Sequence, residues 1–101
     1  MRGRFEKIKR RVLGEKYDLS LVFADNTLMK KLNATYRKKN SPTNVLSFPL
    51  SAEQGEIFLS KNIKNPGEKE YLFVHSLLHL KGYRHGKRME SEEEKIMAIV
   101  Q

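Results

Sequence analysis

The chain has 101 residues, of which 39% are hydrophobic and 9% aromatic, a composition that fits one folded domain with a single core and excludes a disordered chain. Twenty lysines and arginines against twelve aspartates and glutamates give a formal net charge of +8, which favours polyanionic partners, nucleic acid before an anionic membrane. The absence of cysteine excludes disulfides and thiolate metal sites.

The N-terminal segment predicts a short basic amphipathic helix. Phe5, Ile8 and Val12 recur at helical spacing among lysines and arginines, and Gly14 marks the end. We interpret it as a helix with one buried stripe in preference to a dedicated RNA arm. The segment lacks the apolar core of a secretory signal, and no apolar run approaches the roughly 18 residues of a membrane span. We therefore expect one cytoplasmic domain over residues 1–101, without membrane contact.

A strand and a second helix are predicted next. The continuous apolar run "LSLVFAD", residues 19–25, has the length of a strand and indicates an interior one. Asp25 or Asn26 can cap the following segment, "TLMKKLNATYR". Four of its residues share one face of a helix: Leu28, Met29, Leu32 and Tyr36.

Two short strands follow, "NVLSFPL" and "GEIFLS". The connecting "SAEQG" has the length of a hairpin connection. Pro49 cannot donate a backbone hydrogen bond, so it places the end of the first strand at an edge or a bulge. We therefore predict a hairpin.

A helix is predicted after "NPG", residues 65–67, and extends through about Lys81. Its apolar residues surround most of its circumference, which is typical of a buried helix. Gly82 provides the stop. The helix should therefore occupy the centre of the domain.

The last segment, "SEEEKIMAIV", offers Ser91 as an N-cap and Glu94 three residues later, the capping-box pattern. We expect its glutamates, residues 92–94, to be solvated near the positive end of the helix dipole. The predicted order is helix, strand, helix, two strands and two helices. This order indicates an α+β fold, a small mixed β-sheet of three or four strands covered by helices.

All three histidines follow the spacing H-x3-H-x5-H. His75 and His79 lie one turn apart on the buried central helix, and Gly82 lets the chain turn so that His85 can join them. Three imidazoles and a water form an open tetrahedral site typical of catalytic zinc. We predict one zinc ion, with nickel, copper or iron as alternatives. The alternative is three unrelated histidines, two in the core and one in a loop.

A protease with the related pattern H-E-x-x-H needs a glutamate directly after the first histidine as its general base. Ser76 occupies that position here. A hydroxyl cannot hold the required negative charge at neutral pH, so peptidase chemistry is disfavoured.

Two segments carry a family resemblance. "HSLLHLKGYRHG" resembles the H-G-x-L-H-L-x-G-Y-D-H signature of the YbeY endoribonucleases, the bacterial ribosomal RNA maturation factors. "LNATYRKKNSPTNVLSFPL" resembles the family's L-N-x-x-Y-R-x-x-D-x-P-T-D-V-L-S-F-P segment, and "GEIFLS" resembles its G-D-I strand. The blocks occur in the family's order and cover roughly residues 26–90.

Several residues of the chain depart from this pattern. Asn44 and Arg84 replace aspartates, Ser76 replaces a glycine, and Glu56 replaces an aspartate conservatively. A cation at position 84 costs Coulomb energy beside a bound dication unless it points away or meets a phosphate.

The resemblance implies a metal-dependent, single-strand-specific endoribonuclease that matures the 3′ end of small-subunit ribosomal RNA and takes part in ribosome quality control. Its implied partners are ribosomal RNA and the small ribosomal subunit. Either activation of water by the metal or attack by the ribose 2′-hydroxyl remains possible. The oligomeric state and protein partners stay open.

Arg37 aligns with the arginine of the family's Y-R pair, which is implicated in function. A guanidinium suits the charge that builds on phosphate during cleavage, so we predict catalytic roles for Arg37, His75, His79 and His85. Thr43 and Ser47 are candidates to line the cleft, although ordinary strand roles are equally compatible. For Tyr83 we prefer packing over base stacking. Six cations are candidates to hold the RNA backbone, although for any single one we prefer a solvated surface position: Lys38, Lys39, Lys81, Arg84, Lys87 and Arg88.

Three functions therefore remain to be distinguished. The preferred one is a metal-dependent ribonuclease. The others are a ribosome-associated RNA-binding protein with a structural metal and no catalysis, and a zinc hydrolase of another class. Arg84 and Asn44 depart from the family pattern and so leave the RNA-binding protein possible. Ser76 and the net charge oppose the zinc hydrolase.

Overall fold

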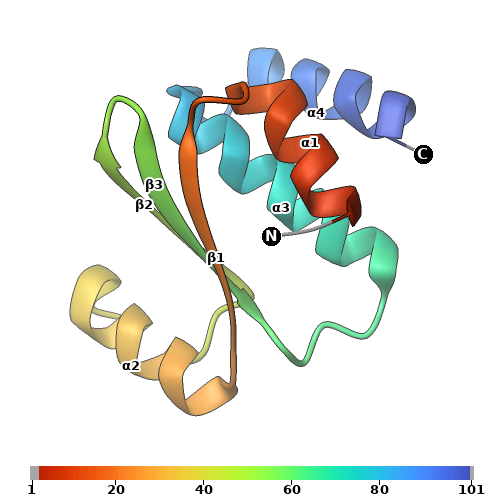
Figure 1. The fold of residues 1–101 in the computed structure, drawn as a ribbon. Helices are drawn as coiled ribbons and strands as arrows, with labels where there is room; N and C mark the ends of the chain where they lie inside the picture. Colours follow the sequence, from red (N-terminus) through yellow and green to blue (C-terminus); the bar gives the residue numbers. More distant parts are fainter. Residues whose placement is uncertain (1–2, 101) are drawn as a thin grey trace.

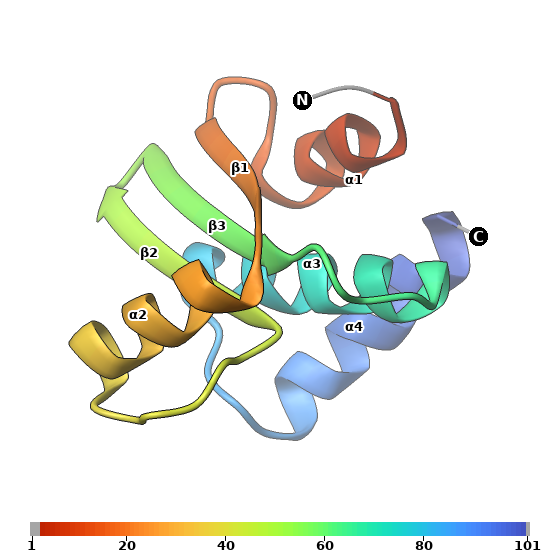
Figure 2. The same cartoon turned by 90° about the horizontal axis from the view of Figure 1, so that it is seen from below.

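A computed structural model describes residues 3–100 and confirms the predicted α+β order (Figure 1). The elements are α1 (Gly3–Leu13), β1 (Asp18–Ala24), α2 (Asn26–Arg37), β2 (Val45–Ser51), β3 (Gln54–Ser60), α3 (Pro66–Lys81) and α4 (Lys87–Val100). Helices α1, α3 and α4 lie on one side of the sheet and α2 on the other, as both views show (Figures 1 and 2). No helix within residues 3–100 is long and apolar enough to span a bilayer.

The sheet is mixed and has three strands in the order β1-β3-β2. β3 pairs parallel with β1 and antiparallel with β2. The predicted hairpin is confirmed, and only Ala52 and Glu53 separate its strands. The register of β2 shifts between Pro49 and Ser51, where the sequence predicted an edge or a bulge.

The prediction that residues 19–25 form an interior strand is wrong, because β1 lies at an edge of the sheet and β3 takes the centre. The apolar run has another cause. Leu19 and Leu21 pack against the core on the side of α3, whereas Ala24 belongs to the small cluster under α2. A continuous apolar run reports that both faces of a strand are covered. It does not report whether both edges are paired.

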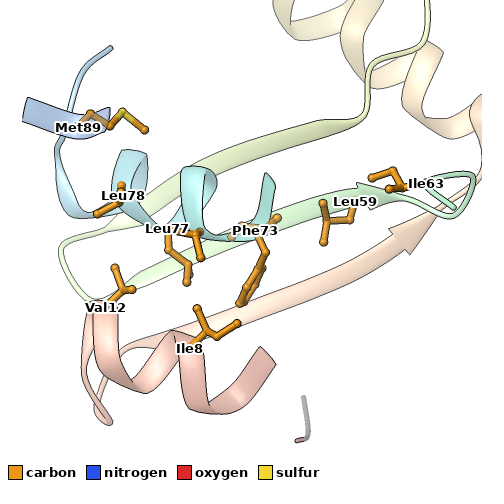
Figure 3. Packing of buried hydrophobic residues seen from close by; sticks show 10 residues of the cluster. Ile8, Val12, Leu59, Ile63, Phe73, Leu77, Leu78 and Met89 are labelled. Carbon is orange, nitrogen blue, oxygen red and sulfur yellow. The ribbon is translucent and has the colours of Figure 1, made fainter. Parts of the chain in front are cut away.

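The main core lies between the sheet and helices α1 and α3 (Figure 3). Its centre is Phe73, which is fully buried and meets Phe5 edge to face at a centroid distance of 4.8 Å. The buried members are Ile8, Val12, Ile57, Leu59, Ile63, Phe73, Val74, Leu77, Leu78 and Met89. Burying each larger side chain contributes about 1.5–3 kcal/mol, so this cluster fixes α3 as the buried central helix.

Helix α2 packs on the opposite face of the sheet through a smaller cluster. Asp25 caps it, since its carboxylate accepts a hydrogen bond from the Leu28 backbone N–H at 2.9 Å. Met29 is fully buried, whereas Tyr36 is 64% exposed. The helix ends at Arg37, immediately before a left-handed residue.

The prediction that Ser91 caps the last helix is wrong, because α4 begins at Lys87. Gly86 adopts a positive φ of 152°, and its carbonyl accepts a hydrogen bond from the Glu90 N–H at 3.0 Å. The chain therefore enters the helix directly after this glycine, and Ser91 lies in its second turn.

Gly55 of β3 should tolerate no side chain. A Cβ there would collide with the Tyr17 hydroxyl and approach two Leu80 methyl groups at 3.1 and 3.2 Å. We expect Gly55→Ala to lower the free energy of unfolding by about 1–3 kcal/mol, as measured by urea denaturation.

A second substitution serves as the control for Gly55→Ala. The Tyr17 hydroxyl is buried and has no hydrogen-bond partner among the described residues, so Tyr17→Phe alone should cost little. In the double variant it should restore part of the lost stability. Equal stability of Gly55→Ala and the wild type would contradict the packing described.

Candidate metal centre

The three histidines converge at the C-terminal end of α3. His75 and His79 lie on successive turns of that helix, and His85 lies in the loop before α4. One ligand nitrogen from each lies within 4.8 Å of the other two. The ring centroids are separated by 4.6 to 4.9 Å. The structure therefore brings together all three predicted ligands.

The helix terminus explains how His85 reaches the pair. Gly82 adopts a left-handed conformation with φ 112°, and its N–H donates to the His79 carbonyl at 3.0 Å. The Tyr83 N–H donates to the Leu78 carbonyl at 2.9 Å. These bonds satisfy the last carbonyls of α3 and reverse the chain. His85 consequently returns toward the helix.

Hydrogen bonds assign the proton of His79 to its Nδ1. That nitrogen lies 3.1 Å from the Tyr83 carbonyl oxygen, which can only accept. In the neutral ring, Nε2 is therefore left with a lone pair.

His75 carries the same arrangement. Its Nδ1 lies 2.7 Å from Oε1 of Glu93, and a carboxylate also only accepts. In the neutral ring, its Nε2 therefore holds a lone pair as well. The Nε2 atoms of His75 and His79 stand 3.1 Å apart.

Two lone pairs that face each other repel, and either a proton on one of the nitrogens or a metal ion between them relieves that repulsion. Burial is the largest cause of a lowered pKa at His79, so an added proton on the His79 ring is disfavoured. Two nitrogens bound tetrahedrally to one zinc at about 2.0–2.1 Å would stand about 3.3 Å apart, close to the observed spacing. The donor set therefore fits a divalent metal ion.

A cleft of about 250 Å³ opens onto the histidines. It is lined by Arg37, Thr43, Val45, Ser47, Leu72, His75, Ser76, His79 and His85. Arg37 comes from the end of α2, so the cleft joins residues from opposite sides of the sheet. Thr43 and Ser47, for which the sequence left a cleft role and an ordinary strand role open, both line this cleft.

The cleft is open on the side of the loop, because His85 is exposed while His75 and His79 are half-buried. Arg84 is exposed and lines a different, basic cleft of about 430 Å³. Lys81, Gly82, Tyr83 and Arg88 complete that second cleft. Arg84, which replaces an aspartate of the family pattern, therefore does not line the histidine cleft.

Tyr83 packs against the main core, as preferred from the sequence. Its hydroxyl donates to Oε1 of Glu92 at 3.4 Å. Its backbone carbonyl has a direct role at the site, since it is the partner of His79.

Glu93 is the residue that the sequence analysis missed. The prediction that residues 92–94 are all solvated is wrong, because Glu93 is only 4% exposed and contacts His75. A signal was present in the sequence. Met89, Glu93 and Met97 recur every fourth residue, so the glutamate occupies the apolar stripe by which α4 packs.

Comparisons with known proteins agree with these features. The sequence model of the family described as "Endoribonuclease YbeY" matches residues 3–101. The Endoribonuclease YbeY of Ehrlichia chaffeensis is 40% identical in an alignment 87 positions long that covers 71% of this chain and 56% of that protein. That of Neorickettsia sennetsu is 34% identical in an alignment 105 positions long that covers 83% of this chain and 73% of the relative.

A solved structure shares the fold. The solution structure of TM1509 from Thermotoga maritima superposes with a TM-score of 0.64 at 26% identity, covering 96% of this chain and 76% of that one. The chain thus spans between 56% and 76% of the length of these three proteins.

Proposed function

The chain belongs to the YbeY endoribonuclease family, and from this premise we propose that it is a metal-dependent endoribonuclease that cleaves single-stranded RNA. The observation that carries the proposal is the pair of Nε2 atoms facing each other at 3.1 Å beside an arginine-lined cleft. The proposed role is maturation of the 3′ end of small-subunit ribosomal RNA and ribosome quality control. The proposed partners are ribosomal RNA and the small subunit, in the cytoplasm.

His75, His79 and His85 are the proposed metal ligands, and zinc is the proposed ion because three imidazoles suit it. A divalent cation held there would supply Lewis-acid chemistry toward a phosphate oxygen or a water molecule. The chain's own contribution is to present three unprotonated nitrogens at one point. The Tyr83 carbonyl and the Glu93 carboxylate hold two of the rings in that state.

Arg37 is the proposed contact for the scissile phosphate. It lines the same cleft as the three histidines, and its planar guanidinium can donate two parallel hydrogen bonds to phosphate oxygens. Charge that accumulates on the phosphate during cleavage would strengthen those bonds. The arginine therefore stabilises the transition state more than the bound RNA.

A structural metal is less well supported. Structural zinc sites are closed by four protein ligands, whereas the cluster formed by residues 3–100 has three histidines, one of them exposed. The open position favours catalysis. A peptidase is opposed by Ser76, which is buried at the back of the cleft and offers no carboxylate.

RNA binding should weaken steeply with salt, because the chain carries a net charge of +8 and a basic cleft adjoins the site. Contacts to four phosphates of a single strand would give a log–log slope of about −3. Fluorescence anisotropy with a labelled single-stranded RNA measures this slope. A slope near zero would remove the electrostatic contribution from the proposal.

Single-turnover cleavage of matched single-stranded and double-stranded RNAs tests the proposed function. We expect cleavage of the single strand only, and its loss when a chelator removes the metal. Binding of both RNAs without cleavage, at full metal content, would instead support an RNA-binding protein with a structural metal.

A further inference from the structure

We propose that Glu93 is a positioning residue that holds His75 in its metal-binding tautomer and orientation. The inference rests on the proposed metal site and adds an outer partner that belongs to a different helix. Glu93 lies on α4 and His75 on α3. Oε1 of Glu93 and Nδ1 of His75 are 2.7 Å apart, a short separation for a hydrogen bond to a carboxylate.

The burial of Glu93 indicates that its carboxylate is paired with hydrogen-bond donors. Its side chain is 6% exposed, and glutamate is almost never so buried unless it is paired. A buried carboxylate needs donors that offset its lost hydration. His75 is one such donor. A hydrogen bond to the same carboxylate is also the largest cause of a raised pKa at Tyr71, which identifies a second.

Tyr71 and His75 lie together on α3, with ring centroids 6.1 Å apart. Tyr71 and Glu93 also line one cleft. The 2.7 Å contact between Glu93 and Nδ1 of His75 therefore restrains how the imidazole can turn.

Glu93 contacts the His75 ring on the side that points away from His79. Glu93 meets Nδ1, whereas Nε2 faces His79. Glu93 therefore stands outside the cluster of ligand atoms, which contains only the three histidines. An acceptor at Nδ1 disfavours the tautomer that carries its proton on Nε2, which could not bind a metal through that atom. A carboxylate in this place also raises the basicity of the ligand nitrogen.

Zinc affinity of Glu93→Gln is the test, measured by competition with a chromophoric chelator. Glutamine keeps the shape but loses the charge, and its amide N–H₂ can donate to Nδ1 and favour the wrong tautomer. We expect zinc to bind about 10- to 100-fold more weakly. Glu94→Gln is the matched control, since this exposed neighbour undergoes the same change of charge and should bind zinc as the wild type does.

A second measurement separates positioning from a merely structural clamp between α3 and α4, and requires no variant. Two-bond ¹H–¹⁵N spectra of the metal-free wild type, recorded at a pH where the spectra show a neutral ring, report which nitrogen of His75 carries the proton. We expect Nδ1. A proton on Nε2, or equal zinc affinity in Glu93→Gln and Glu94→Gln, would overturn the inference.

Failure of the inference can be told apart from failure of the proposed function. If the wild type binds zinc and His79→Ala loses it, the site stands whatever Glu93→Gln does. If the wild type binds no zinc, the site fails, and the tautomer of His75 still decides whether Glu93 positions that ring.

Discussion

Replacing His79 with alanine should remove most of the zinc and reduce cleavage of single-stranded RNA to background. The substitution deletes one of three ligands, so zinc affinity should fall by more than the roughly 10- to 100-fold that loss of an outer partner costs. A metal ion contributes several kcal/mol to the transition state, which corresponds to at least about 10³-fold in rate. Elemental analysis of untagged protein and single-turnover cleavage measure the two effects.

The fold should survive this substitution. His79 is half-buried and lies outside the main core, so circular dichroism of His79→Ala should match that of the wild type. Glu68→Ala, an exposed change on the same helix, should keep both metal and activity. Full metal content in folded His79→Ala would show that the ion is bound elsewhere.

Replacing Arg37 with alanine should slow cleavage by about 10²- to 10³-fold, equivalent to about 2.7–4 kcal/mol of transition-state stabilisation. The guanidinium gains most when charge accumulates on the phosphate, so the loss should appear in turnover more than in RNA affinity. Zinc content should not change, because arginine is not a ligand. Arg37→Lys should recover only part of the rate, since it keeps the charge but loses the planar fork.

Lys30→Ala is a matched control for Arg37→Ala, because it removes a positive charge from an exposed position of the same helix. It should weaken RNA binding slightly and leave single-turnover cleavage at saturating RNA unchanged. Equal cleavage rates in the wild type, Arg37→Ala and Arg37→Lys would show that Arg37 does not have its proposed role.

The cluster of three histidines could be predicted from the sequence because its geometry is local. His75 and His79 are four residues apart on one helix, and Gly82 ends that helix just before His85. Periodicity and one glycine therefore place all three. The fold followed for a similar reason, since the elements have their own apolar patterns and α2 and α3 also have N-capping residues.

Arg37 could be predicted only through the family resemblance. It lies on α2, across the sheet from α3, and the cleft that joins it to the histidines is walled by Val45 and Ser47 of β2. No periodicity connects residues on different elements. Its place is a product of tertiary packing, which composition and spacing do not report.

Glu93 was missed for a different reason. Three consecutive glutamates resemble a solvated run. The interpretation of that segment relied on their charge and not on their positions along the helix. Position was the better guide, because Met89 and Met97 mark the side of α4 that packs inward. The error at β1 was similar, since hydrophobicity revealed covered faces but not an unpaired edge.

Titrating metal-stripped protein with zinc, while following single-turnover cleavage of a single-stranded RNA, tests most directly whether one ion held by the three imidazoles makes this chain a nuclease. We expect no cleavage by the stripped protein, a linear rise in rate with added zinc, and a sharp break at one zinc per chain. Full cleavage by the stripped protein, or none when the site is saturated with zinc, would contradict a metal-dependent nuclease.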